Sequence, residues 1–392
     1  MKKRLIAITK YFKFLYKIYY YIGTIFVNVL KIFIKPSDKI ILFNSFGGKK
    51  FDDSTRAIYE YMVEDDRFND YEFVWAFHEP DDFNIPKGKK IKVDTFEYFK
   101  VALKARCWIS NSSIGRGLEF KGKKTYYFNT LHGTPIKMMG NDIISNNKSF
   151  GSNSKKNLVD NYTSQSEYEA DIFSRVLNDD KSKFLIYGLP RNDRLVKYTE
   201  EEVKNIKEQL SIPLNKKVIL YAPTFREYER NSRFECVIDI PINFDKWEKE
   251  LGEQYVFLLR AHYEVAEIIN TNKNSKFVYD VSDYKSLDDL MIVSDLLISD
   301  YSSIFFDYSI MNKPMICYTY DYDKYSKNRG MYFDIRDEIE GGSLSEDELI
   351  EMILKLNKKL NIEKVEKFRN KYVQCYGNAT ELSVDKIYEN IK

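Results

Sequence analysis

Short apolar runs alternate with amphipathic, helix-period segments along most of the chain after residue 37. The runs over residues 39–46, 71–77 and 107–110 are typical of buried strands, and the segments at 54–64 and 95–105 between them predict helices. Strands that alternate with helices predict a parallel, doubly wound sheet. The first half of the chain is therefore predicted to form an α/β domain.

A second series of the same kind follows a charged helix predicted at 200–210. Its expected strands are 217–222, 255–259, 277–281, 296–298 and 314–320, and its expected helices include 244–251, 287–293, 346–360, 363–372 and 381–391. The chain is thus predicted to be α/β, with Rossmann-like doubly wound domains at 38–198 and 199–378 that face a cleft. Residues 1–37 and 379–392 are expected to be separate helical segments.

The N-terminal segment is basic and amphipathic. Eight Lys or Arg residues precede the first acid, Asp38, and at about 100° per residue the polar positions fall on one narrow stripe of a helix. Its uncharged part, residues 18–30, is about 20 Å long, which is short for a hydrocarbon layer of about 30 Å. The pattern favours a helix on an anionic membrane surface. A helix packed on the protein's own core and a true span remain open alternatives.

Composition narrows the classes of function. With 392 residues the chain is long enough for two cores, and its four cysteines are too far apart to suggest a zinc site or a disulfide framework. Neither a dinucleotide fingerprint nor a P-loop is present. No set of ligand-type side chains indicates a divalent metal, and Asp321, Asp323 and Asp334 are interpreted as solvated or capping acids. Basic stripes typical of nucleic-acid binding are missing from the globular part.

The stretch Ser299-Asp300-Tyr301-Ser302-Ser303 joins an apolar run to a predicted helix. Amides of a first helical turn and serine hydroxyls bind phosphate groups well. Ser302 or Ser303 acting only as a helix cap is the plain alternative. Taken alone, the stretch fits a phosphate site and a plain helix cap equally well.

The chain contains three histidines, and two of them follow predicted strands. His132 follows the strand at 124–131, and a helix is expected to begin at Thr134-Pro135 directly after it. His262 follows the strand at 255–259. Strand ends are where open α/β sheets place ligands, and an imidazole suits proton transfer near neutral pH. His78 is interpreted as structural.

Several cations and hydroxyls stand at the same strand ends. Arg260, Thr224 and Arg226 follow strands of the second domain, and with Ser302 and Ser303 they predict a site for a diphosphate. A plain salt bridge remains the alternative for each arginine. Gly47-Gly48 is interpreted either as a turn or as backbone that approaches a substrate.

These motifs together resemble the CDP-glycerol glycerophosphotransferase family, the teichoic acid primases and polymerases. The resemblance extends from Lys39 to about Asp334. Its segments are Ser45-Phe46-Gly47-Gly48-Lys49 with Arg56-Ala57-Ile58-Tyr59-Glu60-Tyr61, His132-Gly133-Thr134-Pro135-Ile136-Lys137, Gly188-Leu189-Pro190-Arg191-Asn192-Asp193, Tyr221-Ala222-Pro223-Thr224-Phe225-Arg226, Arg260-Ala261-His262, Ser299 to Ser303, Asn312-Lys313-Pro314 and Arg329-Gly330-Met331-Tyr332-Phe333. Leu131, where the family often has tryptophan, and Ser54-Thr55, where Asn-Pro is common, depart from the pattern.

The resemblance implies a GT-B-like architecture and a reaction. An alditol phosphate, glycerol phosphate or ribitol phosphate, would move from a CDP-alditol to a hydroxyl of a polyprenyl-linked acceptor, releasing CMP. His132 would be the general base, and His262 with Arg260, Ser302 and Ser303 would hold the donor diphosphate. The remaining implied site residues are Thr224, Arg226 and Asp300 for the donor, and Gly47, Gly48, Lys137 and Arg191 for the acceptor or cleft.

The resemblance also implies a place and partners for the enzyme. A lipid-linked acceptor gives the basic helix a purpose, so the protein is expected at the cytoplasmic face of the bacterial membrane, as a peripheral protein with no tightly bound cofactor. Because the polymerases' large N-terminal extension is missing, a primase-like or few-step transferase is expected. The alternatives are a GT-B glycosyltransferase that uses a nucleotide sugar and a membrane-surface scaffold that binds nucleotide without turnover.

Overall fold

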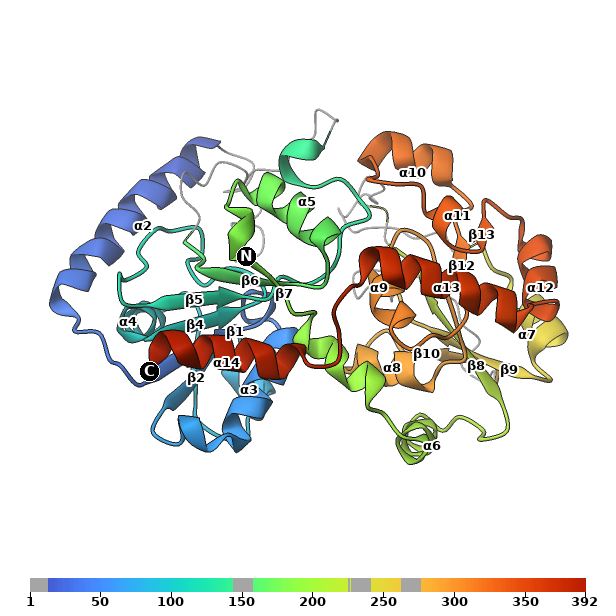
Figure 1. Ribbon diagram of the computed structural model, residues 1–392, viewed down its shortest axis with the longest axis horizontal. Coiled ribbons are helices and arrows are strands. Elements are labelled where there is room, and N and C mark those ends of the chain that lie inside the picture. The colour runs from blue at the N-terminus through green and yellow to red at the C-terminus, as the bar shows by residue number, and fades with distance from the viewer. Residues whose placement is uncertain (1–12, 144–157, 225, 227–240, 262–275) are drawn as a thin grey trace. The chain divides into compact units, whose positions relative to one another are not determined.

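The computed structural model describes residues 13–143, 158–224, 226, 241–261 and 276–392. The chain divides into two compact units (Figure 1). The first unit comprises Met1–His132, Ser149–Asp193 and Asn378–Lys392, and the second comprises Gly133–Lys148 and Arg194–Gly377. The segment 133–148, predicted in the first domain, belongs to the second unit, and the C-terminal helix, predicted as a separate segment, belongs to the first unit.

A seven-stranded parallel sheet forms the centre of the first unit. Its strand order is β3-β2-β1-β4-β5-β6-β7. The strands are β1 (Ile40–Asn44), β2 (Glu72–Phe77), β3 (Lys89–Lys92), β4 (Cys107–Ser110), β5 (Tyr126–Asn129), β6 (Asn161–Ser164) and β7 (Phe184–Ile186). The order reverses direction between β1 and β4, which makes this the switch point where doubly wound sheets place ligands.

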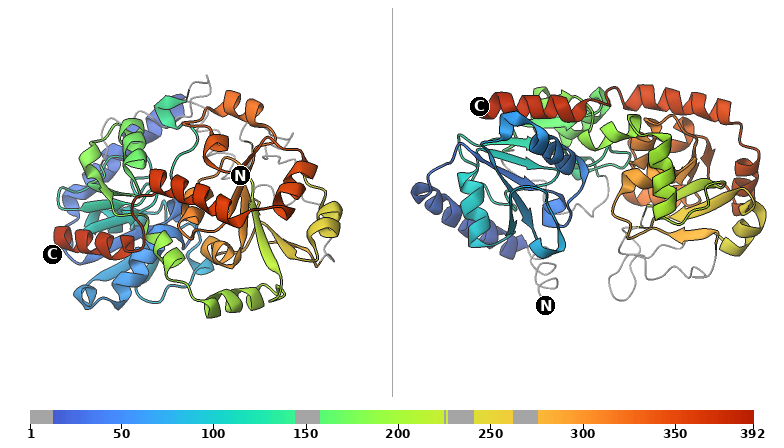
Figure 2. Two further views of the ribbon diagram at one scale, coloured as in Figure 1. Left: turned by 45° about the vertical axis from the view of Figure 1, so that its right-hand side comes forward. Right: turned by 90° about the horizontal axis from the view of Figure 1, so that it is seen from below.

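Helices cover both faces of this sheet. They are α3 (Asp53–Glu64), α4 (Phe96–Lys104), α5 (Glu167–Leu177) and α14 (Ala379–Ile391). Alternate strand residues such as Phe43 and Trp75 pack in one core with Tyr59 of α3 and Ile387 of α14, as the two-residue period of a strand requires. Helix α14 lies beside α3 (Figures 1 and 2), so the chain's end completes the core of its first half.

The second unit repeats the arrangement with six parallel strands. Its order is β10-β9-β8-β11-β12-β13, with the switch point between β8 and β11. The strands are β8 (Lys217–Ala222), β9 (Tyr255–Leu259), β10 (Val278–Asp280), β11 (Leu296–Ser299), β12 (Met315–Tyr318) and β13 (Gly341–Gly342). The predicted α/β class with parallel, doubly wound sheets is therefore confirmed.

The helices of the second unit follow its strands in the expected alternation. They are α6 (Glu200–Gln209), α7 (Phe244–Leu251), α8 (Leu287–Val293), α9 (Ile304–Ser309), α10 (Tyr322–Arg329), α11 (Ile335–Glu338), α12 (Glu346–Leu354) and α13 (Lys358–Tyr372). Trp247 of α7 and Leu349 of α12 pack with Phe257 in one core. The single helix predicted at 346–360 is wrong, because α12 ends at Leu354 and the Asn357 side chain caps α13.

Helix α2 (Lys13–Phe33) packs on the first unit through its polar stripe. Asn28 Nδ2 donates to the Glu119 carbonyl (2.8 Å) and Lys31 Nζ to the Lys121 carbonyl (2.9 Å). The packed arrangement, left open from the sequence, therefore holds for this stripe. In the part of the chain that the structure describes, no helix has the length and apolar character to cross a membrane.

Candidate functional site

Three loops meet at the carboxyl edge of the first sheet. Asn111, directly after β4, accepts a hydrogen bond through Oδ1 from the Phe46 amide (2.7 Å). Ser112 Oγ accepts one from the Gly47 amide (2.9 Å). Both bonds join the loops after β1 and β4 across the switch point, where ligands of doubly wound sheets bind. The loop after β5 adds His132 to the same edge.

Gly47 and Gly48 form the tight turn after β1. Both have positive φ angles, 65° and 93°, and a Cβ on Gly48 would lie 2.9 Å from Val93 Cγ1. The Gly48 amide donates to the Ser45 carbonyl (2.9 Å), and the Gly47 amide is bonded as described above. Because both amides bond within the protein, the geometry favours the turn over backbone that approaches a substrate.

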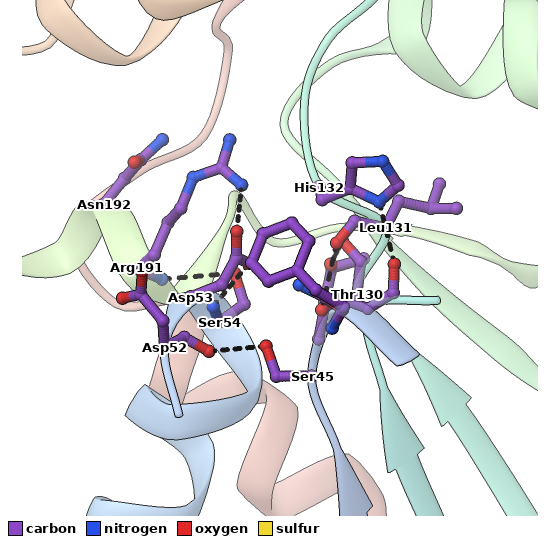
Figure 3. Close-up of polar contacts among 12 residues, drawn as sticks. Ser45, Asp52, Asp53, Ser54, Thr130, Leu131, His132, Arg191 and Asn192 are labelled. Atoms are coloured by element: carbon purple, nitrogen blue, oxygen red, sulfur yellow. Dashed lines mark hydrogen bonds and ion pairs between the residues drawn. The ribbon is translucent and has the colours of Figure 1, made fainter. Parts of the chain in front are cut away.

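His132 is exposed, and its ring is held at one nitrogen. Nδ1 lies 2.9 Å from the Asn111 carbonyl oxygen (Figure 3). A carbonyl only accepts, so Nδ1 carries the hydrogen in the neutral ring and Nε2 keeps a free lone pair. The ring of Phe46 packs edge to face against the imidazole, with centroids 5.7 Å apart. His132 therefore has the tautomer that a general base requires.

Arg191, in the short helical turn Pro190–Val196 after β7, contacts the start of α3 in the same unit. Its Nη1 pairs with Asp53 Oδ2 (2.9 Å), and its amide donates to Ser54 Oγ (3.3 Å) (Figure 3). Asp53 has a positive φ of 68°, which is uncommon outside glycine. Burial raises the pKa of the neighbouring Asp52 carboxyl. Of the four predicted acceptor or cleft residues, the structure places Gly47, Gly48 and Arg191 in the first unit.

The helix predicted from Thr134-Pro135 is wrong, because this segment is extended. Lys137 forms an antiparallel bridge with Met331, and the Tyr332 amide donates to the Ile136 carbonyl (2.9 Å). Ile136 is also buried, with 2% exposure. These tertiary contacts outweigh the preference of Thr134-Pro135 for starting a helix. Lys137 thus belongs to the second unit, whereas the other three predicted acceptor or cleft residues belong to the first.

Gly133, the residue after His132 in the chain, packs against the predicted phosphate loop of the second unit. A Cβ on Gly133 would lie 2.9 Å from Ser303 Oγ. Its φ of 151° lies in a region that other residues rarely adopt. Glycine at this position therefore permits the close approach to Ser303.

At the second switch point, Asp300 joins the loops after β8 and β11. Its Oδ1 accepts from the amides of Thr224 (2.8 Å) and Tyr301 (2.7 Å). Thr224 Oγ1 is buried and has no hydrogen-bond partner within the described residues. Asp300, one of the predicted donor-site residues, therefore fixes the turn.

Arg226 is buried, not directed at a ligand. Its Nη1 pairs with Asp300 Oδ2 (2.8 Å), and its Nε and Nη2 pair with the Asp321 carboxylate at 2.7 Å and 2.9 Å. The residue is 2% exposed, and the rings of Tyr301 and Tyr325 lie against its guanidinium. The salt-bridge alternative therefore describes Arg226. Asp321, interpreted as a solvated or capping acid, is paired with Arg226, and although it stands at the N-cap of α10 its side chain makes no capping bond.

Arg260 binds the loop after β10. Its Nη1 lies 2.6 Å from each of the carbonyl oxygens of Val281, Ser282 and Tyr284. In this conformation the guanidinium organises backbone at the strand ends. His262, predicted beside it, lies outside the described residues.

Ser302 and Ser303 differ in their use. Ser302 Oγ accepts from the Ile304 amide (3.3 Å), as a capping hydroxyl does. Ser303 stands at the N-cap of α9 but makes no side-chain capping bond. Both are only partly buried. Within the described residues, no three His, Cys, Asp or Glu side chains are grouped closely enough to hold a metal ion.

The family model described as CDP-Glycerol:Poly(glycerophosphate) glycerophosphotransferase matches residues 26–391. The chain belongs to this family. The family predicted from the motifs is thereby confirmed, and with it membership of a group of transferases.

This glycerophosphotransferase family member is similar to proteins named as teichoic acid transferases and polymerases. It is 35% identical over 324 residues to the teichoic acid glycerol-phosphate transferase of Staphylococcus aureus, covering 78% of this chain and 80% of that protein. It is 34% identical over 375 residues to the teichoic acid poly(glycerol phosphate) polymerase of Staphylococcus epidermidis, covering 92% of this chain but 51% of the relative. The chain thus spans about half the length of that polymerase.

Solved structures agree on the fold. The wall teichoic acid polymerase TagF, in a variant form, aligns with a TM-score of 0.84 and 32% identity over 93% of each chain. The UDP-GlcNAc 2-epimerase of Neisseria meningitidis aligns with a TM-score of 0.55 and 13% identity, over 90% of this chain and 100% of the epimerase. The second likeness shows the fold alone.

The structural roles of Asn111 and Asp321 at the two switch points were not predicted from the sequence. Asn111 begins a polar run, Asn111-Ser112-Ser113, directly after a strand. That is the same signal by which Ser299 to Ser303 was recognised. For Asp321 the sequence carries no comparable signal, because its partner Arg226 is 95 residues away.

Proposed function

We propose that this protein transfers an alditol phosphate from a CDP-alditol to a hydroxyl of a polyprenyl-linked glycan acceptor in teichoic acid or related polymer synthesis. The observation that carries the proposal is the bond from His132 Nδ1 to the Asn111 carbonyl, which leaves Nε2 as a base. Similarity to the glycerol-phosphate transferase and polymerase supports the choice of donor. Either CDP-glycerol or CDP-ribitol satisfies the chemistry.

In the proposed reaction, His132 Nε2 accepts the proton of the acceptor hydroxyl as its oxygen attacks the alditol-bearing phosphorus. A new P–O bond forms to the acceptor, the P–O bond to CMP breaks, and CMP leaves with the electron pair. Charge that builds on the phosphoryl oxygens requires donors already in place. We assign Ser302, Ser303 and the Thr224 hydroxyl to this task, with His262 retained as a predicted donor-site residue.

Asp300 and Arg226 act indirectly in this proposal. The Asp300 carboxylate accepts from the Thr224 amide and so orients the Thr224 loop, and Arg226 holds Asp300 in place. Arg260 is assigned to the backbone after β10 in the same way. The proposal includes no tightly bound cofactor, and the CDP-alditol is a substrate.

Helix α2 supports a membrane location. Val27 is buried, but five other apolar residues of the helix point outward: Ile22, Ile25, Phe26, Ile32 and Phe33 are 55–79% exposed. A contiguous exposed apolar face on one helix is typical of a membrane-interface segment. We propose that this face enters the cytoplasmic leaflet while the polar stripe holds the protein, so that a lipid-linked acceptor reaches His132.

The reaction is tested by CMP release and product mass with CDP-glycerol, CDP-ribitol and short lipid-linked acceptor analogues. His132→Ala is expected to lose on the order of 10²-fold or more in turnover. His78→Gln is the matched control and is expected to retain activity. Turnover of UDP- or GDP-sugars alone would establish the glycosyltransferase alternative, and full function of His132→Ala in cells would favour the scaffold.

The membrane assignment is tested by flotation with vesicles that contain anionic lipid. The triple variant Ile22→Glu, Ile25→Glu, Phe26→Glu, like deletion of residues 1–35, is expected to leave the vesicle fraction. Leu360→Glu is the control, because this leucine is 55% exposed but lies on α13. Flotation of the triple variant at the wild-type level would contradict the role of α2.

A further inference from the structure

Asn111 connects the three loops of the first switch point. It is fully buried and follows β4 directly. Its side-chain Oδ1 accepts from the Phe46 amide after β1 (2.7 Å), and its main-chain carbonyl accepts from His132 Nδ1 after β5 (2.9 Å). One residue therefore uses both of its oxygens to hold the two loops on either side of it.

We propose that Asn111 is a positioning residue for His132; this inference rests on the proposed function, in which His132 is the base. The side-chain bond to Phe46 fixes the orientation of the Asn111 residue, and with it the direction of its carbonyl. That carbonyl selects the Nδ1–H tautomer and aims Nε2 away from the sheet edge. Without the anchor, the imidazole loses both its tautomer preference and its direction.

The hydrogen bond from the Phe46 amide to Asn111 also holds the backbone of Phe46. Its φ of 47° is uncommon for a residue with a side chain, and such conformations persist only where the surroundings hold them. The Asn111 bond holds the Phe46 backbone in this state, and the Phe46 ring then packs on the His132 ring. Asn111 thus contacts His132 directly through its carbonyl and indirectly through Phe46.

The other end of the Asn111 side chain indicates a functional reason for an amide here. Within the described residues, its Nδ2 is buried without a hydrogen-bond partner. An unpaired buried donor is costly, so stability alone does not account for this residue type. The acceptor oxygen is the part of the side chain that the fold uses.

The test compares Asn111→Leu, which has a similar volume but no acceptor, with Asn111→Asp, which keeps an acceptor oxygen. Ser112→Ala is the matched control, because it removes the neighbouring bond to the Gly47 amide in the same loop. We expect Asn111→Leu to lower kcat on the order of 10-fold with KM for the CDP-alditol changed less than about 2-fold. Ser112→Ala is expected to lower kcat much less than Asn111→Leu does, because within the described residues the Ser112 side chain hydrogen-bonds to neither His132 nor Phe46. Asn111→Asp is expected to keep more activity than the leucine variant, because a carboxylate oxygen can still accept from the Phe46 amide.

The second readout is the tautomer of His132, measured by ¹⁵N NMR of the full chain labelled at histidine. The protein has three histidines, so substituting each by glutamine assigns the spectrum. Wild type is expected to show Nδ1–H at His132, and Asn111→Leu a shift toward Nε2–H. If the leucine variant does not fold, Asn111→Ala takes its place.

The two proposals fail in different ways. If wild type releases no CMP, the proposed function is wrong, and the NMR comparison alone decides the positioning role. A wild-type tautomer in the Asn111 variant overturns the inference. An equal loss of kcat in Ser112→Ala also overturns it, because the effect would then belong to the loop as a whole.

Discussion

Asp300→Asn isolates the charge of a buried ion pair. Asp300 Oδ1 accepts both backbone amides, and Oδ2 alone pairs with Arg226. An asparagine with its oxygen at the Oδ1 position keeps both amide bonds, and its NH₂ group faces the guanidinium instead of a carboxylate. The substitution therefore removes one ion pair and leaves the turn otherwise bonded.

The magnitude follows from burial. The Arg226 and Asp300 side chains are 3% and 1% exposed, and removing one partner of a buried pair costs about 3–5 kcal/mol. Asp321 still pairs with Arg226, so the lower figure of about 3 kcal/mol applies. With a urea dependence of roughly 2 kcal/mol per molar, the midpoint of the second unit falls by about 1.5 M.

The assay follows each unit separately by ¹⁹F NMR of protein labelled with fluorotryptophan. Trp75 and Trp108 belong to the first unit and Trp247 to the second, and all three are buried. Asp300→Asn is expected to shift the urea midpoint of the Trp247 signal and leave the other two unchanged. Glu351→Gln is the control. It removes an exposed pair with Lys355 on the second unit, which is worth about 0.5 kcal/mol or less. Equal Trp247 midpoints in the two variants would refute the reasoning.

Three further outcomes are expected. Burial lowers the pKa of Lys313 to about 8, below its ordinary value, so above pH 8 the unfolded chain binds more protons than the folded protein. The free energy of unfolding of the second unit, followed by the Trp247 signal, should therefore rise by about 2 kcal/mol from pH 7 to 9.5. Lys313→Met should abolish this rise. Asp193 caps α14 by accepting its first two amides, so Asp193→Ala should destabilise the first unit by about 1–2 kcal/mol in the same ¹⁹F titration, with the Trp247 midpoint unchanged. Gly133→Ala should lower kcat/KM for the CDP-alditol about 10-fold or more in the CMP-release assay. The alanine Cβ would displace Ser303, and the φ angle of residue 133 is one that alanine rarely adopts. An unchanged kcat/KM would contradict the close approach of Gly133 to Ser303.

The strands and helices were predictable where the signal is local. β4, β8, α7 and α8 begin and end at the predicted residues, because apolar periodicity records which side chains face a core. The strand β3 was missed, since three of its four residues are lysines. Charged edge strands of this kind block further pairing and therefore lack the strand signal.

The segment after His132 shows where local signals fail. Thr134-Pro135 is a sound helix start by composition, yet backbone bonds to residues 330–332 hold the segment extended. Those partners lie about two hundred residues away in the sequence. A capping preference contributes about 1 kcal/mol, which several tertiary bonds and a buried isoleucine outweigh.

The predicted role of Arg226 in binding the donor was wrong for a related reason. Position at a strand end was read correctly from the sequence, but the partners of Arg226 were not, because its two carboxylates are 74 and 95 residues away. A cation at a ligand edge has two uses, to bind the ligand or to hold the loop that does. Only the placement of its counter-ions distinguishes them.

The two switch points use one device with different chemistry. In each unit, the first residue after the strand beyond the switch point, Asn111 or Asp300, accepts from an amide in the loop after the unit's first strand. The sequences there are similar, Ser110-Asn111-Ser112-Ser113 and Ser299-Asp300-Tyr301-Ser302-Ser303. Asp300 carries a charge and is matched by a buried arginine. Asn111 is neutral and stands beside a histidine. An amide therefore joins the loops of the first unit without adding a charge beside His132, whereas a carboxylate joins those of the second unit, where Arg226 pairs with it.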